Sequence, residues 1–263
     1  MALRPRFFLA LTAGLLFWVR VSAAEPVAVR HVEGLVRGFL SLRSPDGSLI
    51  AHGDLIQNAR GGRVTSRLIY RFKDGSLQDE TAVFSQRGHF QLISDHLVQK
   101  GPAFERPLDM RIDRSTGHVV VRYKNEHGED KVEDEQMDLP PDLANGLMIT
   151  LLKNVRRDAL PPSVSLIVAT PKPRLVKVTM AATGTEPFSV AGSGRRATHY
   201  VLKIHIGGIA GLVAPLVGKE PPDSHVWILE GEAPAFVRSR APTFMGGPLW
   251  QTDLVSPVWP RER

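Results

Sequence analysis

The feature that most constrains the fold of this chain is a two-residue alternation of apolar and polar side chains that recurs after residue 30. Between residues 108 and 113, Leu108, Met110 and Ile112 alternate with charged residues. Similar alternation occurs at 67–72, 176–180 and 200–206. Because successive side chains of a strand point to opposite faces, this pattern predicts β-strands with one apolar and one polar face. Such strands are typical of antiparallel sheets with one solvated side.

Short turns containing glycine separate these segments, at 44–47, 60–62, 73–75, 87–88, 115–117 and 126–128. Asp-Gly and Gly-Gly pairs supply the positive φ angles that tight hairpins require. The sequence therefore predicts successive hairpins across residues 31–136, with further strands to about residue 250.

One segment, at about 142–157, changes to helical spacing. Its apolar residues recur every three or four positions, at Leu143, Leu147, Met148, Leu151, Leu152 and Val155. Two prolines precede it, Asp142 is placed to cap its first turn, and two arginines close it. We expect an amphipathic helix that either lies across the apolar face of the sheet or braces its edge.

These patterns predict a mainly β protein, with one large curved antiparallel β-meander and one amphipathic helix packed on it. A half-barrel, a closed barrel and two packed sheets all remain compatible with the alternation. The chain has 263 residues and no cysteine, so its stability must come from core burial without disulfides. We expect residues 25–263 to form this single β domain.

Residues 1–24 have the layout of a secretory signal peptide. Arg4 and Arg6 precede an apolar run from 7 to 18, and small residues follow at 22–24. Twelve apolar residues are too few to cross a bilayer, which needs about 20. We therefore expect cleavage after Ala23 or Ala24 and export to the periplasm or beyond, with no stable transmembrane anchor.

Charge and motifs exclude several classes of function. Removal of the three arginines in residues 1–24 lowers the formal net charge from +6 to +3, which is too little to indicate nucleic-acid binding. The sequence lacks the phosphate-loop, G-x-S-x-G and H-E-x-x-H spacings. We predict no cofactor, no metal site and no catalytic residue, although a hydrolase site assembled only in space stays open.

Two C-terminal features indicate apolar contacts. The run from 207 to 219 is free of charge until Lys219 and contains three glycines before Gly218. It could plug one end of a barrel, cover a ligand or contact a membrane. Trp227, Trp250 and Trp259 lie in the last 37 residues, beside the apolar stretch 244–250. Such aromatic density can line a pocket or close the end of a barrel.

A chain with a signal peptide, successive hairpins, an internal helix and no cysteine resembles the bacterial lipoprotein-carrier proteins. That resemblance is architectural, and it implies a strongly curved half-barrel whose open mouth is covered by helices. The stretches 139–147 and 207–219 are also similar to those of uncharacterised secreted bacterial proteins, for which no activity is implied. Resemblance of this kind supports a fold more strongly than a function.

We therefore expect an exported, non-enzymatic protein that binds or carries a hydrophobic ligand such as a lipid or acyl chain. The alternative is a structural or assembly protein of the cell envelope that acts through protein contacts. The predicted ligand-binding residues are those of the sheet's inner face, the helix stripe and the C-terminal apolar features, namely Leu68, Tyr70, Phe72, Leu108, Met110, Ile112, Leu147, Leu151, Tyr200, Leu202, Ile204, Leu212 and Trp227.

Overall fold

The structure is a computed structural model that describes residues 25–169, 172–190, 193–205 and 221–255. The predicted signal peptide, the apolar run 207–219 with Leu212, and Trp259 lie outside the described residues.

The described residues form one antiparallel sheet, in which the strands pair in the order β8-β7-β6-β5-β4-β3-β2-β1-β14-β13-β12-β11-β10-β9. The strands are β1 (Val36–Arg43), β2 (Leu49–Arg60), β3 (Arg63–Phe72), β4 (Leu77–Arg87), β5 (His89–Lys100), β6 (Leu108–Asp113), β7 (His118–Lys124), β8 (Asp130–Gln136), β9 (Val164–Val168), β10 (Arg174–Val190), β11 (Ser193–His205), β12 (Ser224–Leu229), β13 (Ala235–Ala241) and β14 (Trp250–Val255). The predicted mainly β antiparallel meander is confirmed. The sheet is not closed, since β8 and β9 are its two edges within the described part of the chain.

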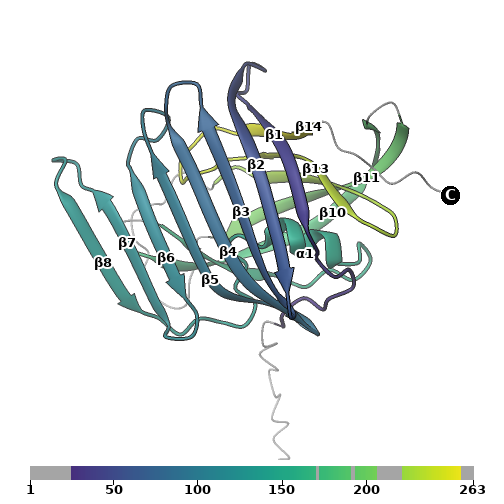
Figure 1. Cartoon of the computed structure of the whole chain (residues 1–263), viewed down its shortest axis with the longest axis horizontal. Helices are drawn as coiled ribbons and strands as arrows, with labels where there is room; N and C mark the ends of the chain where they lie inside the picture. The colour runs from purple at the N-terminus through teal and green to yellow at the C-terminus, as the bar shows by residue number, and fades with distance from the viewer. Residues whose placement is uncertain (1–24, 170–171, 191–192, 206–220, 256–263) are drawn as a thin grey trace, which may run out of the picture.

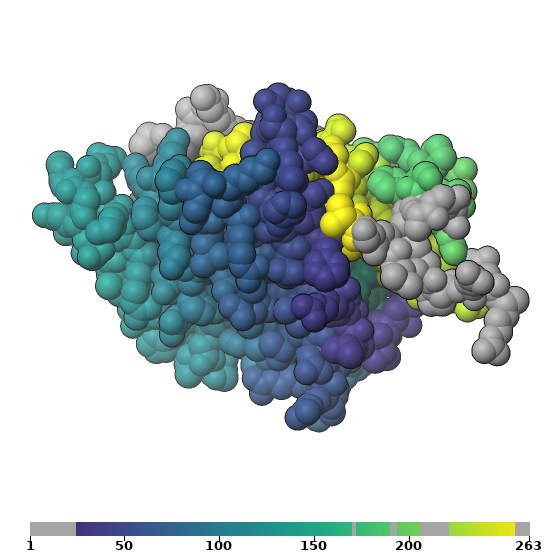
Figure 2. Space-filling view, turned by 45° about the horizontal axis from the view of Figure 1, so that its top comes forward, coloured from purple at the N-terminus to yellow at the C-terminus, as the bar shows by residue number. Residues whose placement is uncertain are grey.

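The first and last strands lie in the middle of this sheet. β1 pairs with β14 through the register from Phe39 opposite Val255 to Arg43 opposite Gln251, and Figure 2 shows the first described residues, in purple, beside the last, in yellow. β1–β8 form one curved wall and β9–β14 form the other, with the helix between them (Figure 1). The sheet therefore encloses an interior and leaves its two edges apart.

The predicted turns are confirmed as tight hairpins. Gly47, Gly61, Gly75, Gly117 and Gly128 all adopt positive φ angles in the connections between consecutive strands. This conformation is readily available to glycine alone, so these residues help to fix the register of each hairpin.

The helix is shorter than the sequence pattern predicts. α1 (Met148–Asn154) has seven residues, and Leu147 at its N-cap provides no side-chain hydrogen bond. The preceding residues, from Asp142 to Asn145, instead run beside β9. Leu143 forms a parallel bridge to Ser165, and the Asn145 amide both donates to and accepts from the backbone of Ile167, each at 2.9 Å. The segment covers the edge of β9, so that backbone polar groups of both are paired, whereas an isolated helical turn would leave the strand edge uncovered.

Asp142 is likewise not the helix cap that the sequence suggested. Its buried carboxylate accepts hydrogen bonds from the Ser165 hydroxyl at 2.8 Å and from Lys177 Nζ at 3.1 Å. It ties the segment before α1 to β9 and β10.

The main core fills the space between the two walls. α1 and the preceding segment contribute Leu143, Leu147, Leu151 and Leu152 to this core. They pack against inner-face residues of both walls, among them Phe84, Leu92, Ile112, Val178, Tyr200 and Leu202. The helix thus occupies the interior between the two walls. A second core, around Tyr70, Phe72 and Trp250, continues the same inner face beneath β1, β3 and β14.

Candidate functional site

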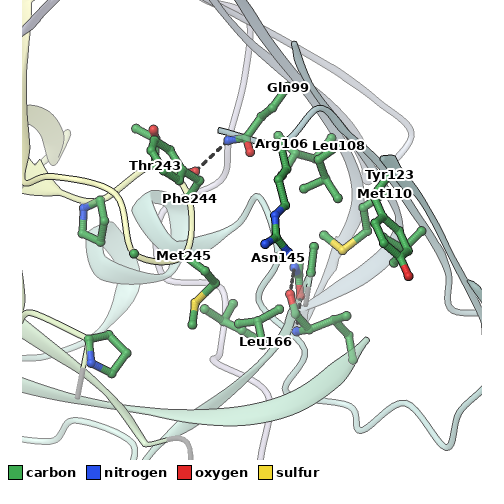
Figure 3. Close-up of a pocket in the computed structure, with 18 of the residues that line it drawn as sticks. Gln99, Arg106, Leu108, Met110, Tyr123, Asn145, Leu166, Thr243, Phe244 and Met245 are labelled. Carbon is green, nitrogen blue, oxygen red and sulfur yellow. Dashed lines mark hydrogen bonds between the residues drawn. The ribbon is translucent and has the colours of Figure 1, made fainter. Parts of the chain in front are cut away.

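A cavity of about 400 Å³ remains at one end of this interior, between β4–β7 on one side and β9 and β11 on the other. Its walls are mostly apolar and include Leu97, Leu108, Met110, Val121, Leu166 and Ile204. The connection between β13 and β14 adds Phe244, Met245 and Gly246 (Figure 3). This volume lies within the range of about 300–1,000 Å³ that small-molecule sites occupy.

The cavity forms because α1 and its preceding segment fill only part of the interior. Asn145 lies at its boundary and is held against β9 by its two hydrogen bonds to Ile167. Gly146 follows with a φ of +65°. A Cβ atom at Gly146 would lie 2.5 Å from Ala82 Cβ and 3.0 Å from Asp95 Oδ1, so the backbone touches β4 and β5 at this point. Glycine is required there for both its conformation and its size.

Polar side chains of β4 and β5 line the inner face beside the cavity. Gln99 Nε2 donates to Gln78 Oε1 at 3.1 Å and to the Thr243 carbonyl at 2.7 Å, which ties the β13–β14 connection to this wall. The Thr243 hydroxyl is buried and has no hydrogen-bond partner among the described residues. The cavity therefore has one polar wall with unused hydrogen-bonding capacity.

Two carboxyl groups, Glu80 and Asp95, continue this polar wall. Glu80 lines the cavity and lies opposite Leu97, whereas Asp95 lies opposite Ala82, two pairs further along the same strands and on the same face. Asp95 is 2% exposed, and neither of its carboxylate oxygens has a hydrogen-bond partner of good geometry in the described structure, although the nearby His96 backbone amide lowers its pKa in part. Burial raises the pKa of both carboxyl groups, and the nearby Glu80 raises that of Asp95 further. Two acids share this region with no cation among the causes of either pKa shift.

Arg106 reaches the cavity from its rim. In Figure 3 its guanidinium points into the space between the walls. The side chain is 52% exposed, and its ion pair with Glu126 is long, at 3.4 Å. Its charge is therefore screened by solvent more strongly than that of the buried Asp95.

Three of the predicted ligand-binding residues, Leu108, Met110 and Ile204, line the cavity. Five others, Ile112, Leu147, Leu151, Tyr200 and Leu202, belong to the main core, where helix and sheet side chains fill the groove that the sequence suggested was open. Leu68, Tyr70 and Phe72 are on the inner face as expected but pack in the second core. The alternation correctly assigned these residues to one face, but it did not indicate how much of that face the chain itself covers.

Trp227 lies on the opposite face of the sheet, so its prediction as a residue of the interior groove was wrong. Its neighbours Val226 and Ile228 take the inner face. Trp227 packs in a small outer cluster with Ala197, Leu229 and Val237. Its indole stacks on the His199 ring at 4.4 Å and donates to Glu186 at 2.9 Å.

The polar groups around His199 do not form a catalytic triad. Thr183 Oγ1 lies 2.9 Å and Glu186 Oε1 lies 3.4 Å from the same ring nitrogen, Nδ1. A triad needs its nucleophile and its carboxylate at opposite nitrogens of the imidazole. The other nitrogen, Nε2, contacts His225 at 3.0 Å. Burial lowers the pKa of His199, although Glu186 acts in the opposite direction.

The described residues contain no cluster of His, Asp or Glu side chains that could hold a metal ion. No helix in the same part of the chain is long and apolar enough to cross a membrane.

Neither Glu80 nor Asp95 is among the residues that the sequence patterns indicate. Glu80 could have been found, because strict alternation places it on the same face as Ala82 and Phe84. Asp95 could not. A bulge at Ile93 reverses the alternation after Leu92, so that Asp95, Leu97 and Gln99 face inward.

No family model and no curated protein matches this sequence. Comparison with solved structures finds similarity to a crystal structure from Brucella abortus, described as a beta-barrel-like protein of a domain of unknown function, DUF1849. The two chains are 10% identical, the match covers 86% of this chain and 98% of the other, and the TM-score is 0.47.

Proposed function

We propose that this protein is an exported, non-enzymatic binding protein that holds a hydrophobic small molecule, such as a lipid or an acyl chain, in the interior cavity. The observation that carries this proposal is the cavity itself, about 400 Å³ in volume and walled mainly by aliphatic, aromatic and methionine side chains. Burial of an apolar ligand against such walls is favourable by about 25 cal/mol per Å² of apolar surface removed from water. Export rests on the layout of residues 1–24, and the lipoprotein-carrier resemblance remains a prediction of architecture.

A displacement assay with a matched pair of variants tests the proposal. The neutral fluorophore N-phenyl-1-naphthylamine should bind the protein and be displaced by decanol. Ile204→Trp places a large side chain in the cavity, whereas Val201→Trp places the same side chain on the outer face of the same strand, opposite His225. We expect Ile204→Trp to weaken fluorophore binding at least tenfold and Val201→Trp to leave it within twofold. Equal binding by both variants, each shown to be folded by circular dichroism, would contradict binding in the cavity.

The alternative proposal, an envelope assembly protein, is favoured by one surface feature. Phe39 and Val255 are paired neighbours on the outer face of β1 and β14, and they are 50% and 37% exposed. Ile56 on β2 is also exposed. Exposed apolar side chains in one region can mark a protein contact. A photocrosslinking residue in place of Phe39 should then capture a defined partner in the native cell envelope, and the same residue in place of exposed Lys124 should not.

A further inference from the structure

We propose that the cavity selects an amphiphile whose polar group is cationic, an alkyl amine in its simplest form, and that Glu80 and Asp95 receive that group. This inference rests on the proposed function, because it specifies which hydrophobic ligand the same cavity holds.

The first step is the absence of a protein cation beside the two acids. Buried carboxyl groups in proteins are normally paired with a cation or fully hydrogen-bonded. The other buried acids follow this rule: Glu33 is paired with Lys153 and Asp142 with Lys177. Asp95, in contrast, has two buried oxygens without a partner, and the described structure gives the Glu80 side chain no hydrogen bond or ion pair. The carboxyl pair is therefore available to receive a cationic group from a bound ligand.

The second step is access. Asp95 is covered by Gly146, whose backbone closes over it, but Glu80 forms part of the cavity wall. A ligand in the cavity can thus contact Glu80 directly, with Asp95 behind it as a second negative group. The buried Thr243 hydroxyl also belongs to the cavity lining and can accept a hydrogen bond from the same ammonium group.

The third step is the discrimination that this arrangement imposes. An alkyl ammonium gains Coulomb attraction from the acids in a site of low dielectric, and its presence favours their ionised form. A carboxylate in the same place would be a third acid beside two that are already difficult to ionise. Because burial already raises the pKa of both acids, a bound carboxylate costs more free energy here than a bound ammonium. An alcohol can hydrogen-bond there but gains no charge interaction.

Among the described residues that line the cavity, Arg106 would favour an anionic ligand. It lies at the rim, half-exposed and in contact with Glu126, so an anionic group could reach it only near solvent. The buried acids should determine the preference, because charge interactions weaken strongly in water.

The test compares decylamine, decanol and decanoate, which share one alkyl chain, in competition with N-phenyl-1-naphthylamine at pH 7.5 and below their micellar concentrations. We expect the amine to bind at least tenfold more tightly than either of the others. Glu80→Gln should reduce this preference to threefold or less. Asp79→Asn is the matched control, since it removes one charge from the neighbouring residue on the outer face, where Asp79 pairs with Arg67; it should leave the preference unchanged.

The outcomes separate this inference from the proposed function. Fluorophore displacement by all three compounds with equal affinity, or an amine preference that survives in Glu80→Gln, would overturn the cationic selectivity and leave the hydrophobic cavity site intact. Preferential binding of decanoate that is lost in Arg106→Gln would overturn it as well, by assigning the polar group to the rim. If neither the fluorophore nor any of the three compounds bound, both proposals would fail.

Discussion

The Lys153→Met substitution would leave the buried carboxylate of Glu33 without its cation. Lys153 on α1 contacts both carboxylate oxygens of Glu33, at 2.5 and 2.7 Å, and the two side chains are only 15% and 5% exposed. Gln57 also donates to this carboxylate at 2.6 Å, and the Gln86 amide holds the Glu33 backbone through bonds of 2.7 and 2.9 Å. The pair therefore attaches the segment before β1 to the helix and to β2 and β4.

Removing one member of a buried ion pair costs about 3–5 kcal/mol, because the other charge stays desolvated. Lys153→Met keeps the length and the apolar stem of the side chain, so the loss should come mainly from the uncompensated charge. With an m-value of about 3 kcal/mol/M in urea, a loss of about 4 kcal/mol lowers the unfolding midpoint by about 1.3 M. Urea titration followed by far-ultraviolet circular dichroism at pH 7 measures this shift.

Two further variants make the interpretation specific. The double variant Glu33→Gln with Lys153→Met removes both charges and should recover at least half of the lost stability. Lys124→Met breaks an exposed pair with Asp130, whose side chains are 48% and 84% exposed, and should change the stability by less than about 1 kcal/mol. A midpoint for Lys153→Met within about 0.3 M of the wild type would show that the Glu33 carboxylate is not desolvated, which would refute this reasoning.

Three other substitutions test the interior. Burial raises the pKa of Glu80 from 4.5 to about 7, so its ionisation opposes folding increasingly as the pH rises from about 4.5 to 8. Over that interval Glu80→Gln should become more stable relative to the wild type, by up to about 3 kcal/mol at about 1.4 kcal/mol per pH unit. Parallel pH–stability curves of the two proteins in urea titration would contradict the burial of this acid. Gly146→Ala should destabilise the protein by about 2 kcal/mol or more, because of the positive φ at this position and the contact with Ala82. Adding Ala82→Gly should restore part of the lost stability, measured by thermal unfolding. No restoration would exclude the steric contribution. Phe84 is fully buried between the walls, and Phe84→Ala should cost about 3–5 kcal/mol in urea titration; a cost below about 1 kcal/mol would place this ring outside the core.

The outer-face position of Trp227 shows where local patterns stop being informative. Aromatic residues are apolar on average, and their density near the C-terminus suggested a pocket. Part of that stretch does reach the cavity, since Phe244 and Met245 line it. Trp227 instead stacks on His199 from the neighbouring strand and bonds to Glu186 two strands away. That environment depends on the pairing of β10, β11 and β12, which no local pattern records.

The helix shows the same limit. The apolar stripe correctly predicted that residues near 151 face a core, yet only Met148–Asn154 is helical. Residues Asp142 to Asn145 bond to β9, a partner more than 20 residues away in the sequence. Competition between a local helical turn and a distant sheet edge can be decided only by the assembled fold.

The sequence alone determined the strands, most of their turns and the apolar face of many strands. These follow from the two-residue alternation and from glycines that accept positive φ, and both are local properties of the chain. Tertiary structure alone decided that α1 fills the interior, that a cavity remains at one end, and that Asp95 faces inward. The bulge at Ile93 depends on the pairing of β4 with β5, and the cavity depends on how two walls distant in the sequence enclose one helix. Side-chain volume and strand curvature act together over the whole sheet, so the location of the empty space is a property of the fold and of no single segment.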